Sequence, residues 1–292
     1  MMGALASFTT MALAGRELTA EMSVFQVMAL RSIICVTVLT AIAARIGFAS
    51  VATARIRMHL VRSAAHYAGT YAWIYGLAVL PLAAVFAIEF TMPIWTAVLA
   101  ALFLHEKFNR WRKAGSALGF VGILVILRPG SEMLDPAAFA VLAAAWCYAA
   151  TYTLTRAMAQ TESPLTIIFW MNLIQLPMGL APALPLWVAP SAEAWPWIAA
   201  MGASGLTSHW CVSHAMRNAE AALVAPMDFL RLPLIAVIGW LFYAEALDLF
   251  VLAGGMLIFA GTMLSIWGER RRRLAAEPAQ AAAGSGAGRP YR

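Results

Sequence analysis

Four ionisable side chains lie inside long apolar runs of the sequence: Arg31, Glu89, Asp228 and Arg231. Charged groups at membrane depth are costly and usually face a cavity or a partner, so they mark a path for an ion or a solute. Asp228 and Arg231 can meet on one helix, which leaves Arg31 as the other cation for Glu89. Two buried structural ion pairs are the alternative to a polar cavity that binds a charged or zwitterionic solute. We expect the cavity, and whether Glu89 or Asp228 also carries a proton stays open.

A polar helix face is predicted on an earlier apolar run. His66, Thr70 and Trp73 follow one another at helical spacing, so they share one side of a helix. This face is expected to line the same cavity and to contact the substrate. Packing between helices is the alternative, because membrane helices also use polar and aromatic side chains to associate.

Four further residues flank the two acids. Pro93 and Pro233 follow them by a few positions, and each removes a backbone hydrogen bond, so we expect a broken helix beside the site. Glu106 and Glu245 stand at the ends of the same two apolar runs. We expect them to act as structural or gating residues rather than as substrate contacts.

The composition indicates the class of protein that holds these residues. Of the 292 residues, 62% are hydrophobic and 12% are charged, whereas soluble domains have about 45–50% apolar and about 25% charged residues. We therefore predict an all-α integral membrane protein. The net charge of +6 does not indicate nucleic-acid binding, because basic residues cluster beside apolar runs, as in Arg270 to Arg273. Three isolated cysteines predict neither disulfides nor a metal site, and no cofactor is expected.

Charged, proline and glycine clusters divide the chain into ten predicted transmembrane helices. Sixteen basic residues fall in the loops and tail on the side of the chain ends, against two on the other side, so both termini are expected in the cytoplasm. Only 14 residues precede Gly15-Arg16-Glu17. They reach about 21 Å at 1.5 Å per residue, so either the first helix is short or the chain begins further upstream, and the sequence leaves both open. The predicted spans are residues 1–14, 24–44, 60–79, 82–104, 113–128, 137–156, 164–188, 195–216, 222–243 and 249–268.

An internal repeat relates the two acids. Residues 83–122 and 222–261 align without gaps, and 13 of the 40 aligned positions are identical. Glu89 falls on Asp228 in this alignment. The offset assigns five helices to each half, and because five is odd, the second half must cross the membrane in the opposite sense. Inverted repeats build secondary transporters, with the substrate bound near the midplane where the halves meet. The predicted units are residues 1–130, residues 131–268 and a disordered basic cytoplasmic tail, residues 269–292.

The segment PIWTAVLAALFLHEKFNRWRKAGSALGFVGILVILRPG resembles the EamA-type half of the drug/metabolite transporter superfamily. The shared features are a helix proline, a glutamate at the helix end (Glu106), and Gly115 and Gly122 in the next helix. The resemblance implies ten helices in two inverted repeats in a bacterial inner membrane. It also implies transport of small metabolites, such as amino acids, their derivatives or vitamins. Within the superfamily, the sequence is similar to members proposed to carry S-adenosylmethionine or riboflavin.

The predicted function is a secondary transporter that moves a small polar or zwitterionic metabolite by alternating access. The chain has no G-x-x-x-x-G-K-[ST] motif, so ATP hydrolysis is not expected. One alternative is a membrane-embedded enzyme, in which Glu89 and Asp228 would share a proton as an acid pair. Another is a non-transporting sensor or assembly subunit, for which the loops leave little room. The expected partners are a small-molecule substrate and the lipid bilayer, with the protein a monomer or a homodimer.

Overall fold

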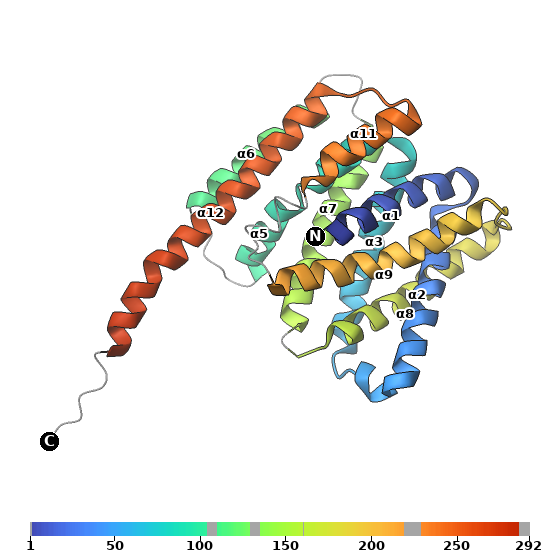
Figure 1. Cartoon of the computed structure of the whole chain (residues 1–292), viewed down its shortest axis with the longest axis horizontal. Coiled ribbons are helices and arrows are strands. Elements are labelled where there is room, and N and C mark those ends of the chain that lie inside the picture. Colours follow the sequence, from blue (N-terminus) through green and yellow to red (C-terminus); the bar gives the residue numbers. More distant parts are fainter. Residues whose placement is uncertain (1, 104–109, 129–134, 160, 219–228, 286–292) are drawn as a thin grey trace.

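A computed structural model of the protein describes residues 2–103, 110–128, 135–159, 161–218 and 229–285. Within these ranges every regular element is a helix, and the order of the helices along the chain is shown in Figure 1. The elements are α1 (Met2–Glu21), α2 (Val24–Ile46), η1 (Phe48–Val51), α3 (Ile56–Val79), α4 (Leu82–Glu89), α5 (Met92–Phe103), α6 (Arg110–Leu127), α7 (Pro136–Met158), α8 (Pro164–Ala183), η2 (Leu184–Leu186), α9 (Ala194–Asn218), α11 (Arg231–Tyr243) and α12 (Leu249–Ser285).

Five of the described segments are long and apolar enough to cross a membrane, and α11 is apolar but shorter. The described part of the chain therefore has the all-helical, membrane-spanning character that the composition predicts. The five segments are Val24–Ile46, Leu82–Leu99, Pro136–Met158, Pro164–Leu186 and Leu249–Arg271.

The first helix extends beyond the span predicted from the sequence, residues 1–14. α1 continues through Arg16 and Glu17 to Glu21, a total of 20 residues. At 1.5 Å per residue it is about 30 Å long, which matches the hydrocarbon core of a bilayer. The two charged residues do not end the helix because both have partners on a distant segment. Arg16 donates to the Glu245 carboxylate, and the Tyr243 hydroxyl donates to Glu17 at 2.5 Å.

The run expected as one span, residues 82–104, is divided beside Glu89. α4 ends at Glu89, a turn follows, and α5 begins at Met92 with Pro93 as its second residue. A proline at this position needs no backbone N–H, because the first turn of a helix has no internal acceptor for it. α11 likewise begins after a turn, and Pro233 is its third residue.

α6 and α12 lie side by side and run antiparallel (Figure 1). Gly115 of α6 faces Gly261 of α12, and Gly122 faces Gly254. A Cβ atom on any of these four residues would clash with the backbone of the partner helix. Small residues permit this close approach of backbones in membrane helices. We call these four residues the glycine seam.

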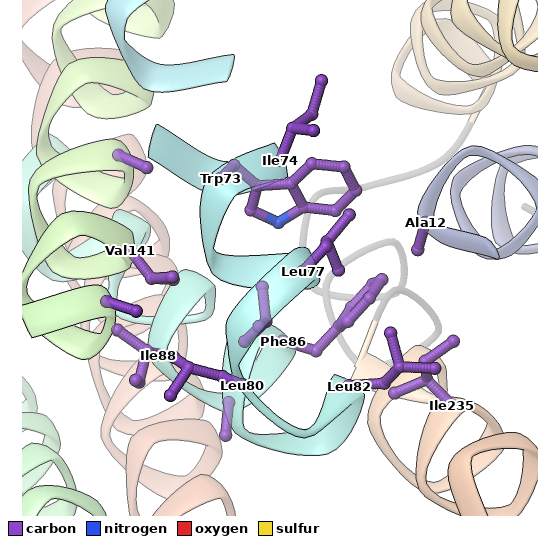
Figure 2. Packing of buried hydrophobic residues seen from close by; sticks show 14 of the residues in the cluster. Ala12, Trp73, Ile74, Leu77, Leu80, Leu82, Phe86, Ile88, Val141 and Ile235 are labelled. Carbon is purple, nitrogen blue, oxygen red and sulfur yellow. The ribbon is translucent and has the colours of Figure 1, made fainter. Parts of the chain in front are cut away.

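The other main helix pairs also join the first half of the chain to the second: α1 packs on α9, α2 on α8 and α3 on α7. Between them lies an apolar core at the corner where α3 turns into α4 (Figure 2). Leu77 of α3, Phe86 of α4 and Ile235 of α11 are fully buried there. This core fixes the corner that carries Trp73 and Glu89.

α12 also differs from the expectation for the tail. The chain from residue 269 was predicted to be disordered, whereas α12 continues to Ser285. Arginine and alanine dominate this stretch, and both have high helix propensity, so the last membrane helix extends beyond its apolar part.

Candidate functional site

The carboxylate of Glu89 lies at the C-terminal end of α4 and is held from two directions. The Trp73 indole N–H of α3 donates to its Oε2 at 2.7 Å. Arg231, the first residue of α11, places Nη1 at 3.8 Å from its Oε1. The Arg231 side chain is buried, at 5% exposure, and the Glu89 side chain is partly buried, at 14%. Three helices from both halves of the chain therefore meet at one carboxylate.

The guanidinium of Arg231 is surrounded by aromatic rings. Its Cζ lies 4.3 Å from the ring centre of Phe8, 5.1 Å from that of Phe90 and 5.5 Å from that of Phe86. Cations are attracted to the faces of such rings, most strongly when water is excluded. Arg231 is thus held by rings as well as by Glu89, which stabilises a buried charge without placing the two groups in close bidentate contact.

A cavity of about 60 Å³ opens beside this pair. Phe90 and Phe229, whose ring centres lie 4.7 Å apart, form part of its wall, and Phe259 stacks next to Phe229 at 4.5 Å. The cavity combines one carboxylate, one guanidinium and several aromatic faces. It is lined by Glu89, Phe90, Met92, Pro93, Phe229, Arg231, Phe259 and Thr262.

A second polar group forms around Gln175 of α8. Its Oε1 accepts a hydrogen bond from Arg31 Nη2 at 2.9 Å. Its Nε2 lies 2.9 Å from His66 Nδ1 and donates to the Ser63 carbonyl at 3.1 Å. Gln175 was not among the residues predicted from the sequence. A neutral amide carries no charge to mark it, although an uncharged polar residue in an apolar run was the available signal.

One face of α3 connects the two groups. His66 lies beside Gln175, Thr70 donates to the His66 carbonyl at 2.8 Å, and Trp73 reaches Glu89. The Tyr148 hydroxyl lies 3.5 Å from the Thr70 hydroxyl. His66, Thr70 and Trp73 therefore form a continuous polar row between Arg31 and Glu89.

The pairing of charges differs from the sequence-based alternative of two ion pairs. Arg31 was the cation left for Glu89, yet Glu89 faces Arg231 and Arg31 faces Gln175. The i, i+3 spacing predicts contacts only between residues on the same helix. The contact of Glu89 with Arg231 arises because α4 of the first half packs against α11 of the second half. Asp228 and Glu106 lie outside the described residues.

Glu245 joins several elements at one end of the bundle, where α1 and α11 end and α4 begins. It binds Arg16 and accepts a hydrogen bond from the backbone N–H of Leu82 at 2.9 Å. The Arg16 guanidinium also lies 5.0 Å from the ring centre of Tyr243. A cavity of about 280 Å³ adjoins this cluster, between α1, α3 and α11. We call this the Glu245 end.

Glu162 occupies the opposite end, where α7 ends and α3 begins. Its Oε1 accepts a hydrogen bond from the Thr53 hydroxyl at 2.7 Å, and its Oε2 lies 3.8 Å from His59 Nε2. Arg62, one turn further along α3, donates to the Thr155 hydroxyl of α7 at 2.6 Å. We call this the Glu162 end. Within the described residues, no group of three His, Cys, Asp or Glu side chains is arranged to hold a metal ion.

Comparison with known proteins identifies the family. The EamA-like transporter family matches residues 1–128 and again residues 135–267. A riboflavin transporter of Rhizobium johnstonii is 32% identical over 230 residues, covering 78% of this chain and 76% of the relative. An S-adenosylmethionine uptake transporter of Rickettsia felis is 26% identical over 219 residues, covering 75% of this chain and 74% of the relative.

A solved crystal structure shares the fold, with a TM-score of 0.65 at 17% identity, over 92% of this chain and 96% of that chain. The family match extends over nearly the whole helical part of the chain, and the curated relatives are transporters. The chain belongs to the EamA-like transporter family, and it is a transporter rather than an enzyme.

Proposed function

We propose that the protein is a secondary transporter that carries a small polar or zwitterionic metabolite across the bacterial inner membrane by alternating access. The observation that carries this proposal is the pair of partly buried Glu89 and buried Arg231 beside a cavity, where the chain breaks between α4 and α5. Broken helices and ionisable groups near the membrane midplane are typical of substrate sites in transporters. The relatives named for riboflavin and S-adenosylmethionine support a polar organic metabolite as the substrate.

The proposed substrate site includes both polar groups and the row between them. In this proposal Glu89 and Arg231 bind a charged part of the metabolite, and the aromatic rings contact its apolar part. Asp228 is included because the sequence alignment pairs it with Glu89. Either acid is a candidate for carrying a coupled proton. The proposed substrate-binding residues are Glu89, Asp228, Arg231, Arg31, His66, Thr70 and Trp73.

We also propose that residues 1–130 and 131–268 are inverted repeats of five helices each. The sequence offset makes α6 equivalent to α12, Gly115 to Gly254 and Gly122 to Gly261. When each glycine is replaced by its equivalent, the contact of Gly115 with Gly261 becomes the contact of Gly254 with Gly122. The glycine seam contains both of these contacts. The pairs α1–α9 and α7–α3 exchange in the same way. Such reciprocity is expected of two units related by a two-fold axis.

The proposed orientation places the Glu162 end in the cytoplasm, with both chain termini on that side. Cytoplasmic loops of membrane proteins carry an excess of lysine and arginine. The Glu162 end holds most of the basic residues that lie near helix ends, whereas the Glu245 end has Arg16 and Arg128. Those near the Glu162 end include Arg45, Arg55, Arg57, Arg110, Arg112, Lys113 and Arg156.

The test is uptake into proteoliposomes, with S-adenosylmethionine, riboflavin and a panel of amino acids as radiolabelled probes. We expect at least one probe to accumulate with wild-type protein, and Glu89→Gln and Asp228→Asn to abolish that uptake while the protein remains folded. Glu193→Gln is the matched control, since Glu193 is exposed. An imposed pH gradient tests proton coupling. Uptake that is unchanged in both acid variants would remove the site from the proposal.

A further inference from the structure

Arg31 is a buried cation at membrane depth. It is the eighth residue of α2, about 10 Å along the helix from its start at 1.5 Å per residue. Arg31 is only 4% exposed. Gly205 of α9 lies against its aliphatic stem, because a Cβ atom there would be 3.7 Å from Arg31 Cδ. α2, α8 and α9 thus enclose the guanidinium away from both ends of the bundle.

The charge of Arg31 is not balanced within the described part of the chain. Its hydrogen-bond partner is the neutral amide of Gln175, and its buried Nε has no hydrogen-bond partner. The hydroxyls of Ser32 and Ser63, which are 1% and 0% exposed, also lack partners there. Arg231 differs because a carboxylate and three rings surround it. A buried guanidinium without a counter-charge is costly, and its five N–H donors match carboxylate and phosphate oxygens.

The amide of Gln175 is fixed so that it orients Arg31. Its Nε2 is occupied by the Ser63 carbonyl and His66 Nδ1, so its Oε1 is the atom that faces the guanidinium. Gln175 is 0% exposed. The guanidinium is therefore held in place on one side by a neutral group, which leaves its charge for a ligand.

We propose that Arg31 and Gln175 form an anion subsite that binds a carboxylate or phosphate group of the transported metabolite. This inference rests on the proposed function and narrows the substrate to organic anions and zwitterions. The row of His66, Thr70 and Trp73 leads from this subsite to Glu89. One substrate molecule can thus contact Arg31 through its anionic group and the Glu89 cavity through the rest of its structure.

The first experiment measures thermal unfolding of purified protein without added ligand. Arg31→Gln removes the unbalanced charge, so we expect its melting temperature to exceed that of wild type. Arg231→Gln removes one member of a pair, and its melting temperature is expected to fall. Arg45→Gln, an exposed position on the same helix, is the control and should change little. A fall in the melting temperature of Arg31→Gln as large as that of Arg231→Gln would overturn the claim that Arg31 lacks a counter-charge.

The second experiment uses two pairs of compounds that differ by one anionic group. S-adenosylmethionine and its decarboxylated form test a carboxylate, and flavin mononucleotide and riboflavin test a phosphate. We expect the anionic member of one pair to raise the melting temperature of wild type more than its partner does. Arg31→Gln should lose this difference, Arg31→Lys should retain part of it, and Arg45→Gln should keep all of it.

Two results would overturn the subsite. One is equal response to both members of each pair in wild type, and the other is an undiminished difference in Arg31→Gln. The proposed function fails separately, by the absence of uptake of every probe, and its Glu89 site fails by uptake that does not depend on Glu89 or Asp228. Uptake of uncharged riboflavin that requires Glu89 but not Arg31 would therefore leave the proposed function intact and remove the anion subsite.

Discussion

The two ends of the helix bundle are closed by different kinds of contact. At the Glu162 end, α5 packs along α7, whereas α11 and α1, which correspond to α5 and α7 in the proposed repeat, make few contacts at the Glu245 end. There the contacts to α1 include the Arg16–Glu245 ion pair and the bond from Tyr243 to Glu17, beside the cavity of about 280 Å³.

This difference indicates which end opens more easily. Separating packed apolar helices exposes surface at a cost of about 25 cal/mol per Å². Polar groups exchange their partners for water at a net cost of about 0.5–1.5 kcal/mol per hydrogen bond. The structure therefore corresponds to a state whose Glu245 end is held by a few polar contacts. In the alternating-access proposal, the opposite state would have α11 packed on α1 and α5 separated from α7.

The largest loss of stability is expected at the glycine seam, because the packing of α6 on α12 joins the two halves of the chain. Gly122→Leu would place a side chain where the backbone of Gly254 lies. Overpacking of this kind costs about 1–3 kcal/mol or more, and we expect a marked loss of thermal stability. Gly205→Ala is the control, since its nearest neighbour is an ordinary contact at 3.7 Å. A Gly122→Leu protein as stable as wild type would show that the seam is not closely packed.

Glu245→Gln tests the polar closure directly. The variant loses a charge-assisted bond to Arg16, of about 1.5–3 kcal/mol, which corresponds to roughly a tenfold shift or more toward the open form. A cysteine introduced at Ala78, which lines the adjacent cavity, should react faster with a maleimide in a background without native cysteines. Asp248→Asn, at the same end but paired with Arg128, should leave the rate unchanged. Equal rates in the Glu245 variant and its parent would mean that the ion pair does not close this end.

Tyr243→Phe removes one hydroxyl from the same closure. Loss of its hydrogen bond to Glu17 should shift the opening equilibrium by about 0.5–1.5 kcal/mol. The labelling rate of the cysteine at Ala78 is expected to rise severalfold, less than in Glu245→Gln. A larger effect than that of Glu245→Gln would assign the closure to Tyr243 rather than to the ion pair.

The smallest effect is expected from Glu162→Gln at the other end. The Thr53 hydroxyl can still donate to the amide oxygen, and the packing of α5 on α7 is untouched. A cysteine at Thr151, a buried position of α7, should change its labelling rate by less than about twofold, because no net hydrogen bond is lost. A strong increase would show that this end is also held mainly by polar contacts.

The helical class of the fold was predictable because long apolar runs with few charges require helices in a membrane. The proline after Glu89 indicated a break, and the structure contains one there. The length of α1 was not predictable, since Arg16 and Glu17 read as the end of a span. Their partners at Glu245 and Tyr243 stand more than 200 residues away in the sequence.

In the site too, contacts within one helix were predictable from the sequence, and contacts between distant helices were not. The shared face of His66, Thr70 and Trp73 follows from helical spacing alone. The partner of Glu89 depends on how α4 packs against α11, and spacing along the sequence does not predict this packing. The sequence therefore indicated Arg31 as the partner of Glu89, whereas the structure has Arg231 there. Gln175 was not predicted as a site residue because it is uncharged, although it contacts Arg31 and His66.

The glycine seam has a geometric consequence for half of the chain taken alone. Gly115 and Gly122 of α6 meet glycines of α12 that have the same seven-residue spacing in the reverse direction. The glycines of α6 therefore match an antiparallel helix that carries glycines at the same spacing. Two helices with this glycine spacing pack closely in opposite directions through the glycines themselves, and the contact needs no covalent connection between them.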